Sequence, residues 1–262
     1  MKPPIALTIA GSDPSGGAGI QADLKTFHQF GVYGEAAITL ITVQNTLGVS
    51  CVEVLPPDLI VQQIQAVIDD IPPQAAKTGA LGNAAVVKAI AALAETFQFP
   101  LIVDPVMIGK HGAPLLDEDA REALIHELIP RATLLTPNIP EAEVLTGLKV
   151  TTLHEMKAAA ERLRKLGAKS VVIKGGHGQG PATDILLHEG EWYEFPAERI
   201  ATRHTHGTGC TFSAAITAEL ARSKSMTQAL ACAKKYVTEA IKTTPELGHG
   251  TGPVNHWAEA SA

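Results

Sequence analysis

Short apolar runs alternate with amphipathic segments along the whole chain. The runs Ile5 to Ala10, Pro100 to Val103 and Ser170 to Ile173 are mostly apolar, which is typical of strands buried on both faces of a parallel sheet. Segments between such runs, for example His154 to Gly167, have the apolar spacing of amphipathic helices. No linker, repeat or low-complexity segment interrupts the pattern. It predicts one domain over residues 1–262, an α/β fold with a single, mostly parallel, doubly wound sheet and helices on both faces.

Local signals place several elements more closely. Pro57-Asp58 predicts a helix from Leu59 to Asp69 with Asp58 as its N-cap, and a further helix is expected near Glu118 to Leu128. Two short runs, Thr183 to Leu187 and Glu191 to Phe195, are joined by a Glu-Gly pair, which predicts a β-hairpin.

The first strand runs into a polar loop, Gly11 to Gly19, which contains four glycines. It has neither the Walker ending nor the dinucleotide spacing of glycines. A loop of this kind after a buried strand is where α/β folds place ligands, although it could also be a plain connection to the next helix. Asp23, early in that helix, could cap it, pair with Lys25 or face a site.

Polar residues also follow the next strands. Gln44 and Asn45 could offer paired donors and acceptors to a heterocycle, or they could form an ordinary turn. Asp104 could hold a divalent cation through water, or it could cap its loop. The segment from Ile108 to Pro114 could act as a lid or as a passive connection.

Two further clusters suggest contacts with magnesium and phosphate. Asn138 and Glu141 share a face of one helical turn, which suits a magnesium hydration shell but equally suits a capping box. Lys174 ends a strand and is followed by glycines, an arrangement that suits a phosphate contact.

The segment from His206 to Ser213 gives the strongest functional signal. Gly207, Thr208 and Gly209 precede Cys210, and an alanine-rich helical run comes next. Backbone N–H groups at the start of a helix form an anion site, so we predict a small-molecule kinase. Turn chemistry and a buried apolar cysteine are the alternative explanation.

Composition narrows the class of protein. The chain is 45% hydrophobic and 18% charged, so it can form a sizeable core. Its net charge of -6 argues against binding to nucleic acid or to an anionic membrane. The three cysteines are widely separated, and no apolar stretch is long enough to span a bilayer. We therefore expect a cytoplasmic protein, and the apolar edge from Val52 to Leu55 suggests a homodimer.

These motifs together resemble the hydroxymethylpyrimidine kinase/phosphomethylpyrimidine kinase family of the ribokinase-like superfamily. The resemblance covers nearly the whole chain and rests on residues 10–23, 77–79, 104–107, 136–138, 174–177 and 206–210. It implies ATP-dependent phosphorylation of 4-amino-5-hydroxymethyl-2-methylpyrimidine (HMP), and then of its monophosphate to the diphosphate, in thiamine biosynthesis.

The resemblance also implies roles for single residues. Cys210 and the amides from Gly207 to Cys210 would form the catalytic anion site, Lys174 would reach the ATP phosphates, and Mg²⁺ would be organised around Asp104 and Glu141. The remaining nucleotide contacts would be Asn138, Thr208 and Gly209, and the substrate contacts would be Gly11, Ala18, Asp23, Gln44, Val106 and Cys210.

Two departures from the family pattern affect these expectations. Ala80 follows Lys77-Thr78-Gly79 where relatives have methionine, which would leave a roomier pocket. Many sugar kinases of the superfamily have an aspartate base where this chain has Cys210. A helix N-terminus would lower the pKa of that thiol, so Cys210 could be the general base or only a wall of the anion site. A pyridoxal kinase on the same fold and a non-catalytic pyrimidine-binding protein remain as alternatives.

Overall fold

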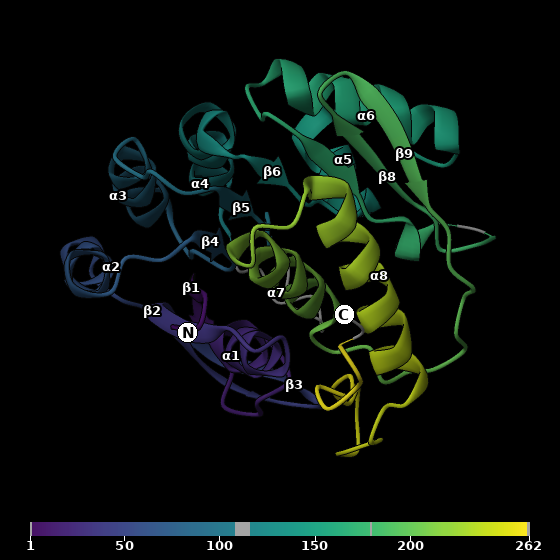
Figure 1. The fold of residues 1–262 in the computed structure, drawn as a ribbon, viewed down its shortest axis with the longest axis horizontal. Coiled ribbons are helices and arrows are strands. Elements are labelled where there is room, and N and C mark those ends of the chain that lie inside the picture. Colours follow the sequence, from purple (N-terminus) through teal and green to yellow (C-terminus); the bar gives the residue numbers. More distant parts are fainter. Residues whose placement is uncertain (1, 108–115, 179, 261–262) are drawn as a thin grey trace.

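The chain forms one twisted sheet covered by helices on both faces (Figure 1). The structure is a computed structural model that describes residues 2–107, 116–178 and 180–260. Within these residues nine strands lie in the order β3-β2-β1-β4-β5-β6-β7-β8-β9. The strands are β1 (Ile5–Ser12), β2 (Tyr33–Asn45), β3 (Gly48–Val54), β4 (Ala75–Thr78), β5 (Leu101–Val103), β6 (Leu134–Leu135), β7 (Val171–Ile173), β8 (Asp184–His188) and β9 (Glu191–Phe195).

The strands from β2 to β7 in this order run parallel, whereas β3, β8 and β9 pair antiparallel with their neighbours. The predicted hairpin is confirmed as β8 and β9. Its turn contains Glu189 and Gly190, both with positive φ, as a tight two-residue hairpin turn requires. The predicted fold class is confirmed.

Two helical layers enclose the sheet. Apolar residues of α1, α7 and α8 form one core with it, and those of α2 to α6 form the other. The helices are α1 (Gly19–Gln29), α2 (Pro57–Asp70), α3 (Ala84–Ala94), α4 (Glu118–Ala123), α5 (Ile139–Thr146), α6 (Leu153–Lys165), α7 (Thr208–Ala221) and α8 (Met226–Lys242).

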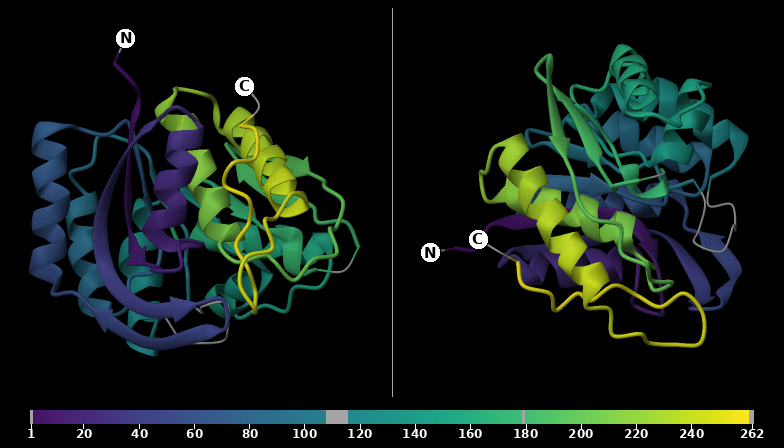
Figure 2. Two further views of the ribbon diagram at one scale, coloured as in Figure 1. Left: turned by 90° about the horizontal axis from the view of Figure 1, so that it is seen from below. Right: turned by 90° about the vertical axis from the view of Figure 1, so that its right-hand side faces the viewer.

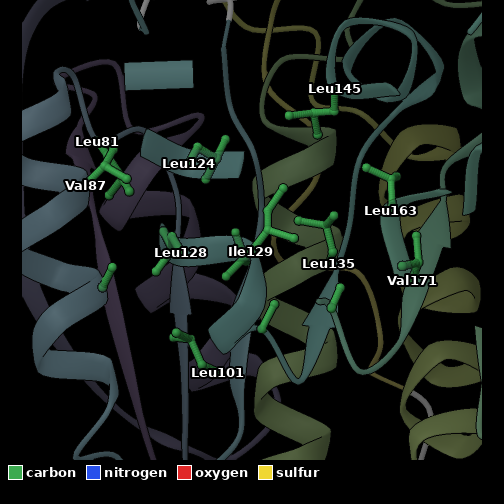
Figure 3. Close-up of a cluster of buried hydrophobic side chains, with 14 of the residues drawn as sticks. Leu81, Val87, Leu101, Leu124, Leu128, Ile129, Leu135, Leu145, Leu163 and Val171 are labelled. Carbon is green, nitrogen blue, oxygen red and sulfur yellow. The ribbon is translucent and has the colours of Figure 1, made fainter. Parts of the chain in front are cut away.

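The short central strands are apolar because both of their faces are covered. Leu101 of β5, Leu135 of β6 and Val171 of β7 belong to the second core, together with Leu128 and Ile129 (Figure 3). Each of these side chains is almost completely buried. Burial on both faces explains why these strands appear in the sequence as continuous apolar runs without alternation.

Some predicted boundaries were wrong. Helix α2 begins at Pro57 after Pro56 as N-cap, so Asp58 lies in the first turn and is not the cap. Helix α4 ends at Ala123, and a π-helical turn, Leu124–Leu128, continues it. The segment from Ile108 to Pro114, considered as a lid, lies outside the described residues.

The C-terminal tail returns to the edge of the sheet at which the parallel strands end. The carbonyl of Thr46, just beyond β2, accepts a hydrogen bond from Thr251 N–H, and His206 N–H donates to the carbonyl of Gly252. Figure 2 shows this tail beside the end of the β2–β3 ribbon. Among the described residues, no helix is both long and apolar enough to cross a membrane.

Candidate active site

Helix α7 begins with a left-handed glycine that the surrounding backbone requires. Gly207 has φ 78° and is the N-cap, and a Cβ at this position would collide with the carbonyl oxygen of Gly17. Thr211 N–H donates to the carbonyl of Gly207, and Thr208 donates to Thr205 through both its N–H and its hydroxyl. No acceptor among the described residues binds the N–H groups of Gly209 and Cys210. These two amides remain available to an anion.

Asp13 holds the glycine loop that extends from β1. Its carboxylate accepts the N–H groups of Ser15, Gly17 and Ala18, and Oδ2 lies 2.7 Å from His206 Nε2. Burial raises the pKa of Asp13, but the hydrogen bonds from His206 and Ser15 outweigh this effect and lower it overall. Asp13 therefore stays ionised and ties the loop after β1 to the segment before α7.

The sequence patterns assign no role to either Asp13 or His206. The Asp-Pro-Ser-Gly stretch is a turn signal that could have indicated a side chain bonded to its own backbone. The contact with His206 spans nearly the whole chain, and no local pattern could have indicated it.

The predicted substrate residues lie along the same edge. Gln44 is the penultimate residue of β2, and its Nε2 lies 3.2 Å from His206 Nε2. Ala18 is the N-cap of α1. A Cβ at Gly11 would collide with the side chain of Leu40, so this glycine is needed for packing. Val106 is partly buried, and its N–H donates to the carbonyl of Asp104.

Lys174 joins the predicted phosphate and metal residues into one cluster. Its Nζ lies 2.9 Å from Asp104 Oδ1 and 3.9 Å from Glu141 Oε2. A Cβ at Gly209 would be 3.4 Å from the same nitrogen, so the ammonium lies beside the free amides of α7. Burial lowers the pKa of Lys174, but the charges of Asp104 and Glu141 raise it overall. Lys174 is therefore a permanent cation at the anion site.

Glu141 also forms the capping box of α5. The side chain of Asn138 accepts the N–H of Glu141, and Glu141 Oε2 accepts the N–H of Asn138. The structural alternative for this pair is thus confirmed, while the side chain of Glu141 still reaches Lys174. Burial and the neighbouring Asp104 raise the pKa of Glu141 to about 7.

Asp104 is held from several sides. Its oxygens lie 3.0 Å from Thr136 Oγ1 and 3.1 Å from Ser213 Oγ, in addition to the contact with Lys174. In the described part of the chain, no group of three or more His, Cys, Asp or Glu side chains forms a preformed metal site. Mg²⁺ usually keeps several waters and uses one or two carboxylates together with substrate phosphates. Asp104 and Glu141 could supply the one or two carboxylates that such an ion needs.

The structure engages the side chain of Asp23 with protein partners, although it lies near Cys210, another predicted substrate contact. The side chain is completely buried, its Oδ1 lies 2.8 Å from Lys77 Nζ, and its Oδ2 accepts the hydroxyl of Thr8. Lys25, the alternative partner for Asp23, donates instead to the carbonyl of Gly16. Asp23 is thus engaged in an internal ion pair beneath α1, and its donors there leave no oxygen directed at a ligand.

Cys210 borders both ion pairs. It is half-buried, and the N–H of Gly19 donates to its sulfur. Burial is the largest influence and raises the pKa of Cys210 to about 11, although the ammonium of Lys77 acts in the opposite direction. The expected lowering by the helix N-terminus is therefore wrong. The thiol keeps its proton at neutral pH, which suits a wall of the anion site better than a general base.

Comparison with known proteins agrees with this geometry. The phosphomethylpyrimidine kinase family matches residues 13–255 of the chain. The chain is 49% identical over 256 residues to the hydroxymethylpyrimidine/phosphomethylpyrimidine kinase of Bacillus subtilis, a match that covers 97% of this chain and 94% of the relative.

Two solved structures are also similar. The phosphomethylpyrimidine kinase of Clostridium difficile has a TM-score of 0.81 and 46% identity, covering 91% of this chain and 99% of that one. The ADP complex of Bacillus subtilis pyridoxal kinase has a TM-score of 0.90 and 39% identity, covering 98% of both chains. With matches over nearly its whole length and a ribokinase-like sheet, the chain belongs to the phosphomethylpyrimidine kinase family.

Proposed function

We propose that the protein uses ATP to phosphorylate HMP and then HMP phosphate, as a step in thiamine diphosphate biosynthesis. The observation that carries this proposal is the cluster of free Gly209 and Cys210 amides beside the ammonium of Lys174. These groups suit a phosphoryl group in transfer, whose charge is spread over its oxygens. The names of the relatives supply the substrate class.

In this mechanism the protein contributes mainly positioning and charge. Gln44 and the loop from Gly11 to Ala18 hold the pyrimidine so that its hydroxymethyl group faces the start of α7. The N–H groups of Gly209 and Cys210 bind the oxygens of the transferred phosphoryl group, and Lys174 binds the phosphates of ATP. Because ATP and the pyrimidine are held in line within one site, the reaction no longer depends on a random encounter of two molecules in the right orientation.

Asp104, Asn138 and Glu141 would organise Mg²⁺ and its waters beside Lys174, where the ion neutralises phosphate charge. Asp104 has its own protein donors, so we propose that it acts through water. Glu141 Oε2, which accepts the N–H of Asn138 in the capping box, also lies 3.9 Å from Lys174 Nζ, so this carboxylate faces the cluster.

Pyridoxal is the second candidate substrate because the similar Bacillus subtilis structure is a pyridoxal kinase. Both compounds are flat nitrogen heterocycles that carry a hydroxymethyl group. Ala80, at the position where the family resemblance implies methionine, bears on the choice because a smaller side chain would leave more room for the substrate. Its carbonyl accepts the hydroxyl of Thr39, which fixes the backbone at this position.

The test is an ADP-release assay with ATP and Mg²⁺ on HMP, HMP phosphate and pyridoxal. We expect kcat/KM for HMP to exceed that for pyridoxal by at least about tenfold, the discrimination that a few pocket contacts provide. A higher value for pyridoxal would reassign the substrate. No ADP release with any of the three would favour a non-catalytic binding protein.

We also propose a cytoplasmic homodimer. Ile41, Val43 and Leu47 are 47%, 59% and 64% exposed on and beside the β2–β3 ribbon, and grouped apolar side chains of this kind mark association surfaces. Light scattering on the purified protein tests the dimer, which a monomeric mass would contradict.

A further inference from the structure

Arg199, in the segment after β9, binds a row of glycine carbonyls after β7. Its guanidinium donates from Nη1 to Gly176 at 2.6 Å, from Nη2 to Gly178 at 2.7 Å and from Nε to Gly180 at 3.0 Å. A longer contact of 3.5 Å joins Nη2 to the carbonyl of Gly175. We call these four carbonyls the glycine row.

The glycine row begins directly after Lys174. The backbone N–H of Lys174 donates to the carbonyl of Pro137, and that of Gly175 donates to Asp184 Oδ1. These bonds fix the start of the segment. The later glycines have no side chains that could anchor them, and glycine loses more conformational freedom on ordering than any other residue. Within the row, the N–H of Gly178 donates to the carbonyl of Gly175. Arg199 binds the carbonyls of all four glycines and so ties this turn to the segment after β9.

The charge of Arg199 is directed at these carbonyls. Among the described residues no carboxylate lies within 4.0 Å of its guanidinium. A guanidinium presents several donors in a rigid planar fork, whereas a lysine ammonium is a compact point charge. Only arginine can therefore reach the separate carbonyls at once.

We propose that Arg199 is a positioning residue for the nucleotide. It holds the glycine row in the shape that aligns Lys174 with the phosphates of ATP, although Arg199 itself touches neither substrate. The inference rests on the proposed function, because it takes Lys174 as the phosphate contact. Without the guanidinium the row would sample other shapes, and ATP affinity would fall in proportion to the population of the competent one.

The test compares Arg199→Ala, Arg199→Lys and the wild type by steady-state kinetics. For Arg199→Ala we expect KM for ATP to rise about tenfold, which corresponds to a competent shape populated roughly one tenth of the time. KM for the pyrimidine and kcat at saturating ATP should change less than about twofold. Arg199→Lys should resemble the alanine variant because a single ammonium cannot replace the fork.

Chemical rescue separates positioning from general stability. Guanidinium ion at millimolar concentration should lower KM for ATP in Arg199→Ala and leave the wild type unchanged. Arg164→Ala is the control, because Arg164 is exposed near the end of α6, at the opposite edge of the sheet from the carboxyl end of β7. Its kinetics and melting temperature should match the wild type.

Three results would overturn the proposal: an unchanged KM for ATP in Arg199→Ala, equal increases in KM for both substrates, or a loss of activity that parallels a lowered melting temperature and is not rescued. Direct titration with an ATP analogue covers the case in which the wild type phosphorylates none of the substrates. The proposed function would then fail, while a selective loss of nucleotide affinity in Arg199→Ala would still support the role of Arg199.

Discussion

Two lysine–aspartate pairs lie on the same side of the sheet and have nearly the same geometry. Lys77 and Asp23 are separated by 2.8 Å, and Lys174 and Asp104 by 2.9 Å. Their surroundings differ. Both side chains of the first pair are completely buried, whereas the side chain of Lys174 keeps 13% of its surface exposed.

In the pair Lys77–Asp23, both oxygens of Asp23 have donors, because the second accepts the hydroxyl of Thr8, and neither side chain is exposed to a further partner. Lys174 instead lies between two carboxylates and beside the free amides of α7. An incoming phosphate can pair with part of the positive charge of Lys174. The carboxylates stay beside the ammonium, so no charge is left unpaired in the interior. A lysine–aspartate pair can therefore contribute to ligand binding when one member is able to change partners. When neither member can, the pair contributes to the stability of the fold.

The strongest effect that we expect is on stability, and it results from breaking the internal pair. Lys77→Met removes the cation and leaves Asp23 buried without a counter-ion, which typically costs about 3–5 kcal/mol. Urea unfolding should show the loss as a lower midpoint with an unchanged slope.

The double variant Lys77→Met with Asp23→Leu makes this test more specific. It removes both charges and keeps apolar volume, so stability should recover most of the loss. If Lys77→Met alone unfolds like the wild type, the internal pair has no structural importance.

The next largest effect that we expect is on catalysis, and it results from removing the lysine of the pair Lys174–Asp104. Lys174→Ala should reduce kcat/KM about 100- to 1,000-fold, the usual cost of removing one group that stabilises charge in the transition state. Removing Lys174 also leaves Asp104 buried without its cation. Because Asp104 keeps the hydroxyls of Thr136 and Ser213 as donors, we expect the fold to persist with a smaller loss of melting temperature than in Lys77→Met. Kinetics and calorimetry on the same preparation check both points, and wild-type turnover would remove Lys174 from the site.

The smallest effect concerns a carboxylate with no partner. Glu35 is buried in β2, and no donor among the described residues reaches either of its oxygens. Burial, together with Asp70, raises its pKa to about 7, whereas the unfolded chain has about 4.3. Between these values the folded protein holds a proton that the unfolded chain has lost, so Glu35 reduces stability as pH rises from about 4.3 to about 7.

Glu35→Gln should therefore raise the melting temperature by roughly 2–4 °C at pH 8, which corresponds to about 1 kcal/mol in a chain of this size. The gain should disappear near pH 4. Exposed Glu53 provides the control Glu53→Gln, which should show no such pH dependence. An equal gain at both pH values would mean that the charge of Glu35 is not the cause.

Much of the architecture could be predicted from the sequence because it depends on local periodicity. Buried strands such as β5 and β7 appear as continuous apolar runs, and the glycines before α7 indicate a turn into a helix. Polar residues that directly follow the strands are expected to lie together at one edge of the sheet, since parallel strands end on the same side. This reasoning put the polar residues after β5, β6 and β7 on one edge, and the structure brings Lys174 within 4.0 Å of Asp104 and Glu141.

The partner that each polar group takes could be learned only from the folded chain. Asp23 and Lys77 are 54 residues apart, and Asp13 and His206 are 193 apart, so no local pattern links them. The same holds for Arg199 and the glycine row and for the pKa of Cys210. The packing of the layers decides which polar groups pair, because burying an unpaired charge costs free energy. A buried charge therefore pairs with the nearest available group of opposite charge or with a hydrogen-bond partner.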